Sequence, residues 1–143
     1  MASRIGITFP RTSYEVEKGK IREFVQAIGD ENPIYIDEEV AKQHGLKTIP
    51  IPKTFPTVIE MWSGVDFDQL IETLKLKKER VLHAKQSYEY INTVYAGDIV
   101  WLETKVVDEY KKKALTFIEL ETIFENEKGE LLMKAHSLIV ETT

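Results

Sequence analysis

The stretch Thr54-Phe55-Pro56-Thr57-Val58-Ile59-Glu60-Met61-Trp62 predicts a helix near the middle of the chain. Thr54 is of a residue type that caps helices, and Pro56 falls in the first turn, where a missing N–H costs nothing. Apolar side chains cover most of the surface of this helix: Val58, Ile59, Met61 and Trp62. We therefore expect the helix to be buried on most sides.

The second half of the chain has the composition of β-strands. Segments 80–92, 98–109, 113–126 and 130–141 are rich in Val, Ile, Thr, Tyr and Phe, and short turns separate them. Glu127-Lys128-Gly129 is typical of a hairpin turn with glycine in the left-handed conformation, and Ala96-Gly97-Asp98 predicts another turn. A long antiparallel sheet needs a cover on one face, and the buried helix is available. The pattern predicts an α+β fold, with a long antiparallel sheet curled around a central buried helix.

The first half of the chain is mainly helical. Apolar residues at i, i+3, i+4 and i+7 predict a helix over Lys18–Ile28 that ends at Gly29. Asp37 is placed to cap a short helix that ends near Gly45, and residues 68–76 predict one more amphipathic helix. With 143 residues and 43% hydrophobic residues, the chain is expected to form one domain over residues 1–143.

Between the first two helices lies the turn Gly29-Asp30-Glu31-Asn32-Pro33-Ile34-Tyr35. The later stretches Pro52-Lys53-Thr54-Phe55-Pro56, Leu82-His83-Ala84-Lys85-Gln86-Ser87-Tyr88-Glu89-Tyr90 and Val94-Tyr95-Ala96-Gly97-Asp98 follow it in a specific order and spacing. Together they resemble the MaoC-like dehydratase family, which includes (R)-specific enoyl-CoA hydratases. The resemblance is strongest to its branch of N-terminal, fatty-acid-synthase-type dehydratase domains. It covers nearly the whole chain and implies a single hotdog domain and dimers with a continuous sheet.

The resemblance implies a site at this turn. Active hydratases of the family read Gly-Asp-x-Asn-Pro-Ile-His, and their Asp and His activate the water that adds to a trans-2-enoyl thioester. The reverse reaction dehydrates an (R)-3-hydroxyacyl thioester. In this chain the catalytic positions correspond to Asp30 and Tyr35. A tyrosine has a pKa of about 10 and is a poor general base at neutral pH, so Tyr35 serves as an acid, positions water, or forms an aromatic wall.

Four further residues are candidate substrate-binding positions: Asn32, Thr54, Phe55 and His83. In the family, backbone amides at the start of the central helix polarise the thioester carbonyl, and these correspond here to Thr54 and Phe55. The family's His-Gly pair in that loop is replaced by Lys53-Thr54. His83 alternates with Lys85, Ser87 and Glu89, which predicts a polar strand face, but its strand follows a loop that could overhang a tunnel.

Each of these residues also has a purely structural interpretation. An Asp before Asn-Pro often stabilises a turn through its own backbone, and Asn32 is expected to hold that turn. His44 and His136 are expected to be ordinary surface or core residues. The resemblance favours a site position for Asp30.

Composition limits the partners. A net charge of −5 argues against nucleic acid and anionic membranes, and the absence of cysteine fits a reducing cytoplasm. The basic runs Lys75-Leu76-Lys77-Lys78 and Lys111-Lys112-Lys113 are either solvated surface or a site for the phosphates of coenzyme A or a carrier protein's phosphopantetheine. No cofactor or metal is expected, because coenzyme A or phosphopantetheine enters as part of the acyl thioester substrate.

Three functions remain open. The first is an enoyl-thioester hydratase or 3-hydroxyacyl-thioester dehydratase, acting as a homodimer in fatty acid metabolism. The second is a catalytically silent acyl-binding subunit of a heterodimer, whose second hotdog subunit carries the Asp–His pair. The third is a hotdog thioesterase with Glu60 as its carboxylate, which ranks last because Met61 and Trp62 suggest that this part of the helix is packed.

Overall fold

A computed structural model describes residues 2–143 and contains a five-stranded antiparallel sheet. The strand order is β1-β3-β4-β5-β2, so β1 and β2 form the two edges of this sheet. Its strands are β1 (Thr12–Glu15), β2 (Val81–Tyr90), β3 (Ile99–Lys112), β4 (Leu115–Glu125) and β5 (Leu131–Thr142). The predicted strands 80–92, 98–109, 113–126 and 130–141 agree with β2 to β5 within a few residues at each end.

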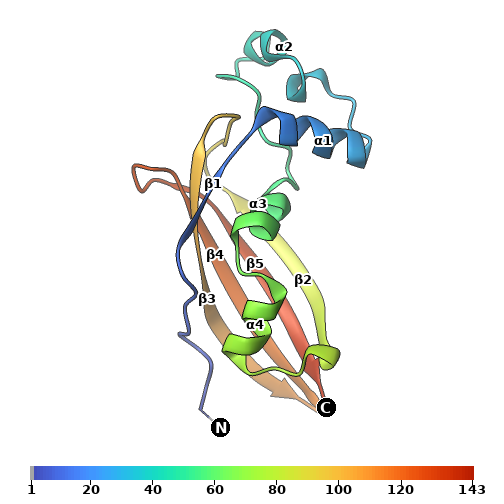
Figure 1. Ribbon diagram of the computed structural model, residues 1–143, viewed down its shortest axis with the longest axis vertical. Helices are drawn as coiled ribbons and strands as arrows, with labels where there is room; N and C mark the ends of the chain where they lie inside the picture. Colours follow the sequence, from blue (N-terminus) through green and yellow to red (C-terminus); the bar gives the residue numbers. More distant parts are fainter. Residues whose placement is uncertain (1) are drawn as a thin grey trace.

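Helices cover one face and one end of the sheet. Figure 1 shows α3 and α4 running along one face, with α1 and α2 at the upper end. The helical segments are α1 (Lys18–Ile28), η1 (Pro33–Tyr35), α2 (Glu38–Gln43), α3 (Pro56–Ser63), α4 (Phe67–Leu74) and η2 (Lys78–Arg80). The predicted α+β fold, with a long antiparallel sheet packed around a helix, is confirmed.

The core has two parts that correspond to the two helices on the sheet face. Phe55 and Ile59, at the start of α3 and within it, pack with Ile21 of α1 and with β3 to β5. Leu70 and Leu74 of α4 pack in the second cluster, against the lower parts of β3, β4 and β5. Burial of such side chains is the main stabilising contribution, and α3 is held at its N-terminal end by the fully buried Phe55.

Local signals in the first half and in the turns predicted the elements well. Helix α1 has the predicted bounds and ends at Gly29, whose φ of 73° is left-handed. Asp37 caps α2 by accepting hydrogen bonds from the amides of Glu39 and Val40. Gly129 has a φ of 78° in the β4–β5 hairpin, as the turn prediction requires.

Three predictions about α3 and the sheet edge are wrong. Phe55, not Thr54, occupies the N-cap position of α3, and no side chain caps the helix. Met61 and Trp62 are each 73% exposed, because α3 buries only the side that contacts the sheet and α1. The apolar character of residues 115–118 predicts a sheet edge that a monomer would leave unpaired, but this segment is not an edge, since β4 pairs with β3 on one side and β5 on the other.

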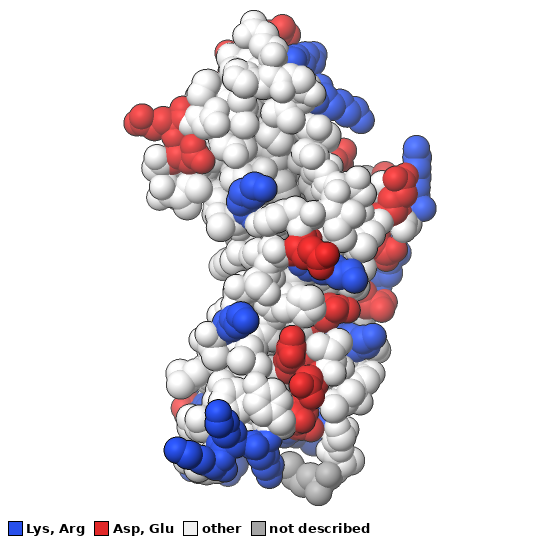
Figure 2. All heavy atoms as spheres, turned by 180° about the vertical axis from the view of Figure 1, so that it is seen from behind, with Lys and Arg blue, Asp and Glu red and all other residues white. Residues whose placement is uncertain are grey.

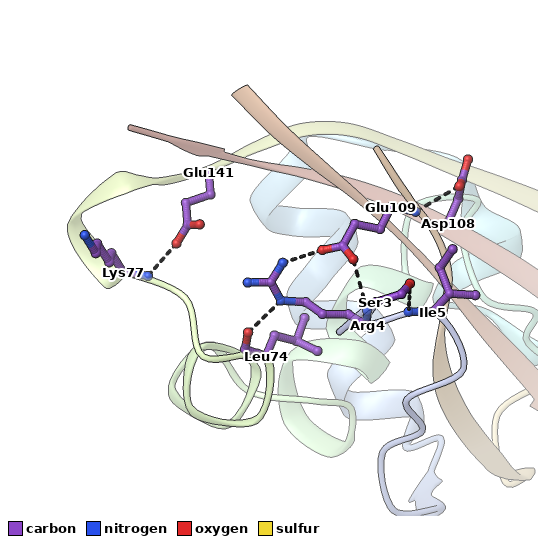
Figure 3. Close-up of polar contacts among 8 residues, drawn as sticks. All are labelled: Ser3, Arg4, Ile5, Leu74, Lys77, Asp108, Glu109 and Glu141. Carbon is purple, nitrogen blue, oxygen red and sulfur yellow. Dashed lines mark hydrogen bonds and ion pairs between the residues drawn. The ribbon is translucent and has the colours of Figure 1, made fainter. Parts of the chain in front are cut away.

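Arg4 ties the N-terminal segment to the lower end of the fold (Figure 3). Its backbone amide donates to Glu109 Oε1 at 3.0 Å, and its guanidinium pairs with the other carboxylate oxygen. Its Nε donates to the carbonyl oxygen of Leu74, the last residue of α4, at 2.7 Å. The side chains of Arg4 and Glu109 are only 11% and 15% exposed, so one arginine joins β3 to the C-terminus of α4.

Among residues 2–143, the structure contains no helix with the length and hydrophobicity needed to cross a lipid bilayer.

Candidate functional site

The turn between α1 and η1 is built from side-chain-to-backbone hydrogen bonds. Asp30 Oδ1 accepts from the Asn32 amide at 2.9 Å, and Asn32 Oδ1 accepts from the Ile34 amide at 3.2 Å. Pro33 then begins the short 3-10 turn that ends at Tyr35. Asp30 and Asn32 therefore stabilise the Asp-x-Asn-Pro turn through their side chains.

Tyr35 lies beside Asp30 and is half-buried. Burial raises the pKa of the Tyr35 phenol above its ordinary value of about 10, and the negative charge of Asp30 raises it further. The phenol is therefore fully protonated at neutral pH. It can donate a hydrogen bond to water or to a substrate oxygen, but it cannot serve as the base that the family's histidine supplies.

A cavity of about 380 Å³ separates Tyr35 from the loop that leads into α3. Its walls are mostly apolar: Ile34, Leu46, Pro50, Ile51, Pro52, Ile91, Val94 and Met133. Its polar lining comes from Tyr35, Lys53, Tyr90, Asn92 and Thr93. The Tyr90 hydroxyl donates to the Lys53 carbonyl, and the Lys53 ammonium lies 4.6 Å from the centroid of the Tyr90 ring. We call this space the Tyr35 cavity. The Pro-framed loop before α3 predicts an apolar slot between the Asp30–Tyr35 turn and the start of that helix, and the cavity lies there, but Asp30 does not line it.

The two amides expected to polarise a thioester carbonyl differ in availability. The Phe55 amide donates to the Pro52 carbonyl at 3.1 Å, and the Phe55 ring is fully buried. The Thr54 amide has no acceptor among residues 2–143, and Thr54 is exposed. Of the two, Thr54 is therefore the one whose N–H is free to bind a ligand oxygen.

The sequence alternation misplaces His83. The β2–β5 register shifts between His83 and Lys85, so His83 lies on the face of Gln86 and not on that of Lys85 and Ser87. Its Nε2 lies 3.1 Å from Gln86 Oε1 and 2.9 Å from Ser137 Oγ. The prediction of a polar strand face shared with Lys85 is wrong, because a β-bulge reverses the alternation.

The other two histidines have local partners. His44 is exposed at the end of α2, where its Nδ1 contacts the Val40 carbonyl oxygen at 2.9 Å. His136 Nε2 lies 3.0 Å from a Glu121 carboxylate oxygen across the β4–β5 pair. Neither residue lines the Tyr35 cavity.

Glu60 is a half-buried titratable residue that the sequence interpretation undervalued. The Tyr88 hydroxyl donates to Glu60 Oε2 at 3.0 Å, and Tyr88 is also 2.7 Å from Thr57 Oγ1. Burial raises the pKa of Glu60 to about 7, against the opposing effect of hydrogen bonds from Tyr88 and Thr122. Met61 and Trp62 were expected to show that this part of the helix is packed in the core. That expectation is wrong, because both side chains are exposed, while Glu60 faces a cavity under α3 and α4. The sequence signal that could have identified Glu60 is an acidic residue within a mainly apolar helix.

The family described as the FAS1-like, dehydratase domain region matches residues 3–135. The chain belongs to this family. A UPF0336 protein of Streptomyces coelicolor is 34% identical over 142 residues, covering 96% of this chain and 92% of that protein.

Two solved structures share the fold. A chain of the HadBC (3R-hydroxyacyl-ACP dehydratase) complex from Mycobacterium tuberculosis superposes with a TM-score of 0.84 at 21% identity, covering 97% of this chain and 98% of that one. The (R)-hydratase from A. caviae involved in PHA biosynthesis superposes with a TM-score of 0.74 at 18% identity, covering 99% of this chain and 98% of that one. The resemblance to MaoC-like dehydratases and the hotdog fold are both confirmed.

In this FAS1-like dehydratase chain the two basic runs meet at one end. Lys111 pairs in register with Thr116, Thr116 pairs with Glu141, and Glu141 accepts from the Lys77 amide at 2.7 Å. Figure 2 shows a group of basic side chains at that lower end. The Gly29–Tyr35 turn lies between α1 and α2, at the opposite end in Figure 1. This separation argues against these lysines holding the phosphates of a thioester bound at Tyr35.

Proposed function

We propose that this chain is the acyl-binding subunit of a heteromeric dehydratase. In the proposed enzyme a second hotdog subunit supplies the Asp–His pair, and the substrate is a trans-2-enoyl or (R)-3-hydroxyacyl thioester. The chain offers its Tyr35 cavity and the free Thr54 amide to the substrate. Coenzyme A or a carrier-protein phosphopantetheine is part of that substrate.

One observation carries the proposal: the pKa of Tyr35, the residue that corresponds by resemblance to the family's catalytic histidine, is raised. Hydration needs a group that accepts a proton from water near neutral pH. The Tyr35 phenol holds its proton there, and the raised pKa moves it further from that role. Asp30 is engaged with the Asn32 amide and does not line the cavity. The site therefore fits binding better than rapid catalysis.

The surface supports a partner subunit. Four large apolar side chains near the α3–α4 junction and the start of β2 are exposed: Met61, Trp62, Phe67 and Leu82. Exposed groups of this kind typically mark interaction sites. Strand β2 is also an edge of the sheet and offers unpaired backbone groups to another strand. The similar HadBC protein is itself named as a complex, so a second hotdog chain is the partner we propose.

A slow hydratase acting as a homodimer is the alternative. Asp30 lies close enough to Tyr35 to raise its pKa by charge, so the two family positions are neighbours here, as catalysis would require. In that case Asp30 is the remaining catalytic group and Tyr35 a hydrogen-bond donor.

The thioesterase alternative has less support. It needs a carboxylate beside a thioester held at the start of α3. Glu60 is the fifth residue of α3, about one turn beyond its first residue, and it lines a different cavity from Tyr35.

The test is hydration of a short trans-2-enoyl-CoA, followed by loss of the conjugated thioester absorbance. The purified chain is assayed alone and with a hotdog partner that carries the Asp–His pair. We expect turnover only in the mixture, at a level above that of the partner alone. Rapid turnover by this chain alone supports the homodimeric enzyme and contradicts the proposal, as does a mixture no faster than the partner alone.

A further inference from the structure

Basic side chains gather at the end of the fold opposite the Gly29–Tyr35 turn. They come from the C-terminus of α4, from η2 and the residues just before it, and from the end of β3 with the turn that follows. We call this group the basic end; its members are Lys75, Lys77, Lys78, Arg80, Lys111, Lys112 and Lys113. Figure 2 shows basic side chains grouped at the lower end of the molecule. The proposed acyl-binding function leaves this surface without a role.

The basic end extends across three strands of the sheet. Lys111 of β3 pairs with Thr116 of β4, which pairs with Glu141 of β5. The Glu141 carboxylate then accepts from the Lys77 amide at 2.7 Å (Figure 3). Because neighbouring strands lie about 4.8 Å apart, the backbones of Lys111 and Lys77 are separated by roughly 15 Å. A ligand that contacts both basic runs must present its charges over a similar distance.

The charges of the basic end are available to an external anion. All of its lysines are exposed, and Arg80 is partly exposed. Among residues 2–143, Lys78 is the only member of the group that pairs with a carboxylate, at 2.7 Å from Asp68. Both side chains of that pair are exposed, and such pairs contribute little, so a ligand carboxylate can replace Asp68 at small cost.

Two of the lysines occupy positions that normally favour glycine. Lys75 follows the last residue of α4 with a φ of 55°, and Lys113 has a φ of 58° in the turn between β3 and β4. A side chain in this left-handed conformation crowds the backbone, a cost that glycine avoids. Glycine fills the other left-handed positions of residues 2–143: Gly6, Gly29, Gly45, Gly97 and Gly129. Strained residues cluster at functional sites, and here both carry the same charge at the same end.

The pattern of charge favours a protein partner over a nucleic acid or a membrane. Acidic residues are interspersed among the lysines, at Asp68, Glu79 and Asp108. A uniformly anionic strand or lipid surface would meet these acids as well as the lysines, whereas a protein segment can place its carboxylates opposite the lysines alone. Except for Arg80, the cations lack the planar fork that recognises phosphate. The net charge of −5 also repels extended polyanions.

We propose that the basic end is a docking surface for an acidic segment of a partner protein. The segment carries several carboxylates over roughly 15 Å, the length of ten helical residues or five extended ones. Lys111, Lys112 and Lys113 contact one end of the segment, and Lys75 and Lys77 contact the other. These contacts are exposed, so they act mainly on the rate of encounter and weaken with salt. The docking surface does not depend on the acyl-binding role of the Tyr35 cavity.

The test is fluorescence anisotropy of a labelled hexaglutamate peptide with the full chain, at low and at physiological salt. We expect saturable binding that weakens at the higher salt. Lys75→Gly/Lys113→Gly removes two charges and relieves the backbone strain. It should weaken binding about fivefold, while the urea midpoint of unfolding stays the same or rises. Lys47→Gly/Lys128→Gly removes the same charge from exposed positions beside the β4–β5 hairpin. This matched control should bind within about twofold of the wild type.

Two further probes separate the classes of partner. Hexathymidylate, which has a similar charge, and phosphatidylglycerol vesicles should both bind more weakly than the peptide. Tighter binding of either one overturns the proposal, as does a wild type that does not bind the peptide or an equal loss in the two glycine variants. If circular dichroism shows that Lys75→Gly/Lys113→Gly is not folded, Lys111→Gln/Lys112→Gln on β3 takes its place. Full peptide affinity in that variant also overturns the proposal.

Discussion

The Tyr88 hydroxyl of β2 donates a hydrogen bond to the Glu60 carboxylate of α3 at 3.0 Å. This contact links the edge strand of the sheet to the helix that packs over it. It also places a half-buried tyrosine beside a carboxyl group whose pKa is about 7. Burial, and to a lesser extent the charge of Glu60, raises the pKa of Tyr88, so the phenol keeps its proton at neutral pH and donates a hydrogen bond to the ionised Glu60 carboxylate.

Glu60 should make the stability of the protein depend on pH. Its pKa is about 7 in the folded chain and 4.5 as a model group. Its contribution is therefore most favourable below pH 4.5 and is lost as the pH rises toward 7. Glu60→Gln cannot ionise, so relative to the wild type it should gain about 3 kcal/mol of unfolding free energy between pH 4.5 and pH 8. Urea denaturation at several pH values measures this gain.

Glu39→Gln is the matched control, since it removes an exposed carboxyl group from α2. The difference in unfolding free energy between Glu39→Gln and the wild type should stay nearly constant with pH. If the difference between Glu60→Gln and the wild type is equally constant, burial does not raise the pKa of Glu60.

Arg4 should contribute substantially to stability. Arg4→Ala leaves the mostly buried Glu109 carboxylate without its guanidinium partner and leaves the Leu74 carbonyl without a donor. We expect a loss of about 2–4 kcal/mol in urea denaturation at pH 7. Hydrogen bonds from the Arg4 amide and guanidinium outweigh burial and lower the pKa of Glu109. The stability due to this pair is therefore present above pH 4.5 and lost as the pH falls below it.

The control for Arg4 is Lys20→Ala, which breaks the exposed Lys20–Glu23 pair on α1. Surface pairs of this kind contribute less than about 1 kcal/mol. Equal losses for the two variants would mean that the Arg4 contacts act like an ordinary surface pair.

The edge strand β2 should mediate association between hotdog chains. Leu82 is 63% exposed on β2, and Leu82→Glu places a charge where a second chain would pair. Sedimentation velocity at micromolar concentration should show a dimer or larger species for the wild type and a smaller one for Leu82→Glu. Ile5→Glu, at an exposed apolar residue outside the strands, should leave the mass unchanged. A monomeric wild type would contradict this prediction.

The elements of this fold could be predicted because their signals are local. The apolar spacing and Gly29 define α1, and segments rich in β-branched and aromatic residues, separated by short turns, define β3 to β5. Strand order is a property of the whole chain, so the apolar segment 115–118 was assigned to an edge while β4 lies between β3 and β5.

The candidate site was only partly predictable for the same reason. The resemblance identified Asp30 and Tyr35, and in the structure the charge of Asp30 reaches Tyr35 and helps to raise the pKa of its phenol. The face of His83 depends on a register shift that residue types do not reveal. Apolar character at Met61 and Trp62 predicted burial, but it does not distinguish residues of the core from residues exposed for a partner.

The central claim is that the chain lacks a base at position 35, and one measurement tests it most directly. Initial rates of trans-2-enoyl-CoA hydration are compared for the wild type and Tyr35→His at equal concentration. Acid–base assistance contributes ~10²–10⁴ in rate. The wild type, which lacks the base, should therefore remain near the uncatalysed rate. Tyr35→His, with Asp30 intact, should exceed the wild-type rate by at least tenfold. Rapid turnover by the wild type that persists in Asp30→Asn would contradict the account.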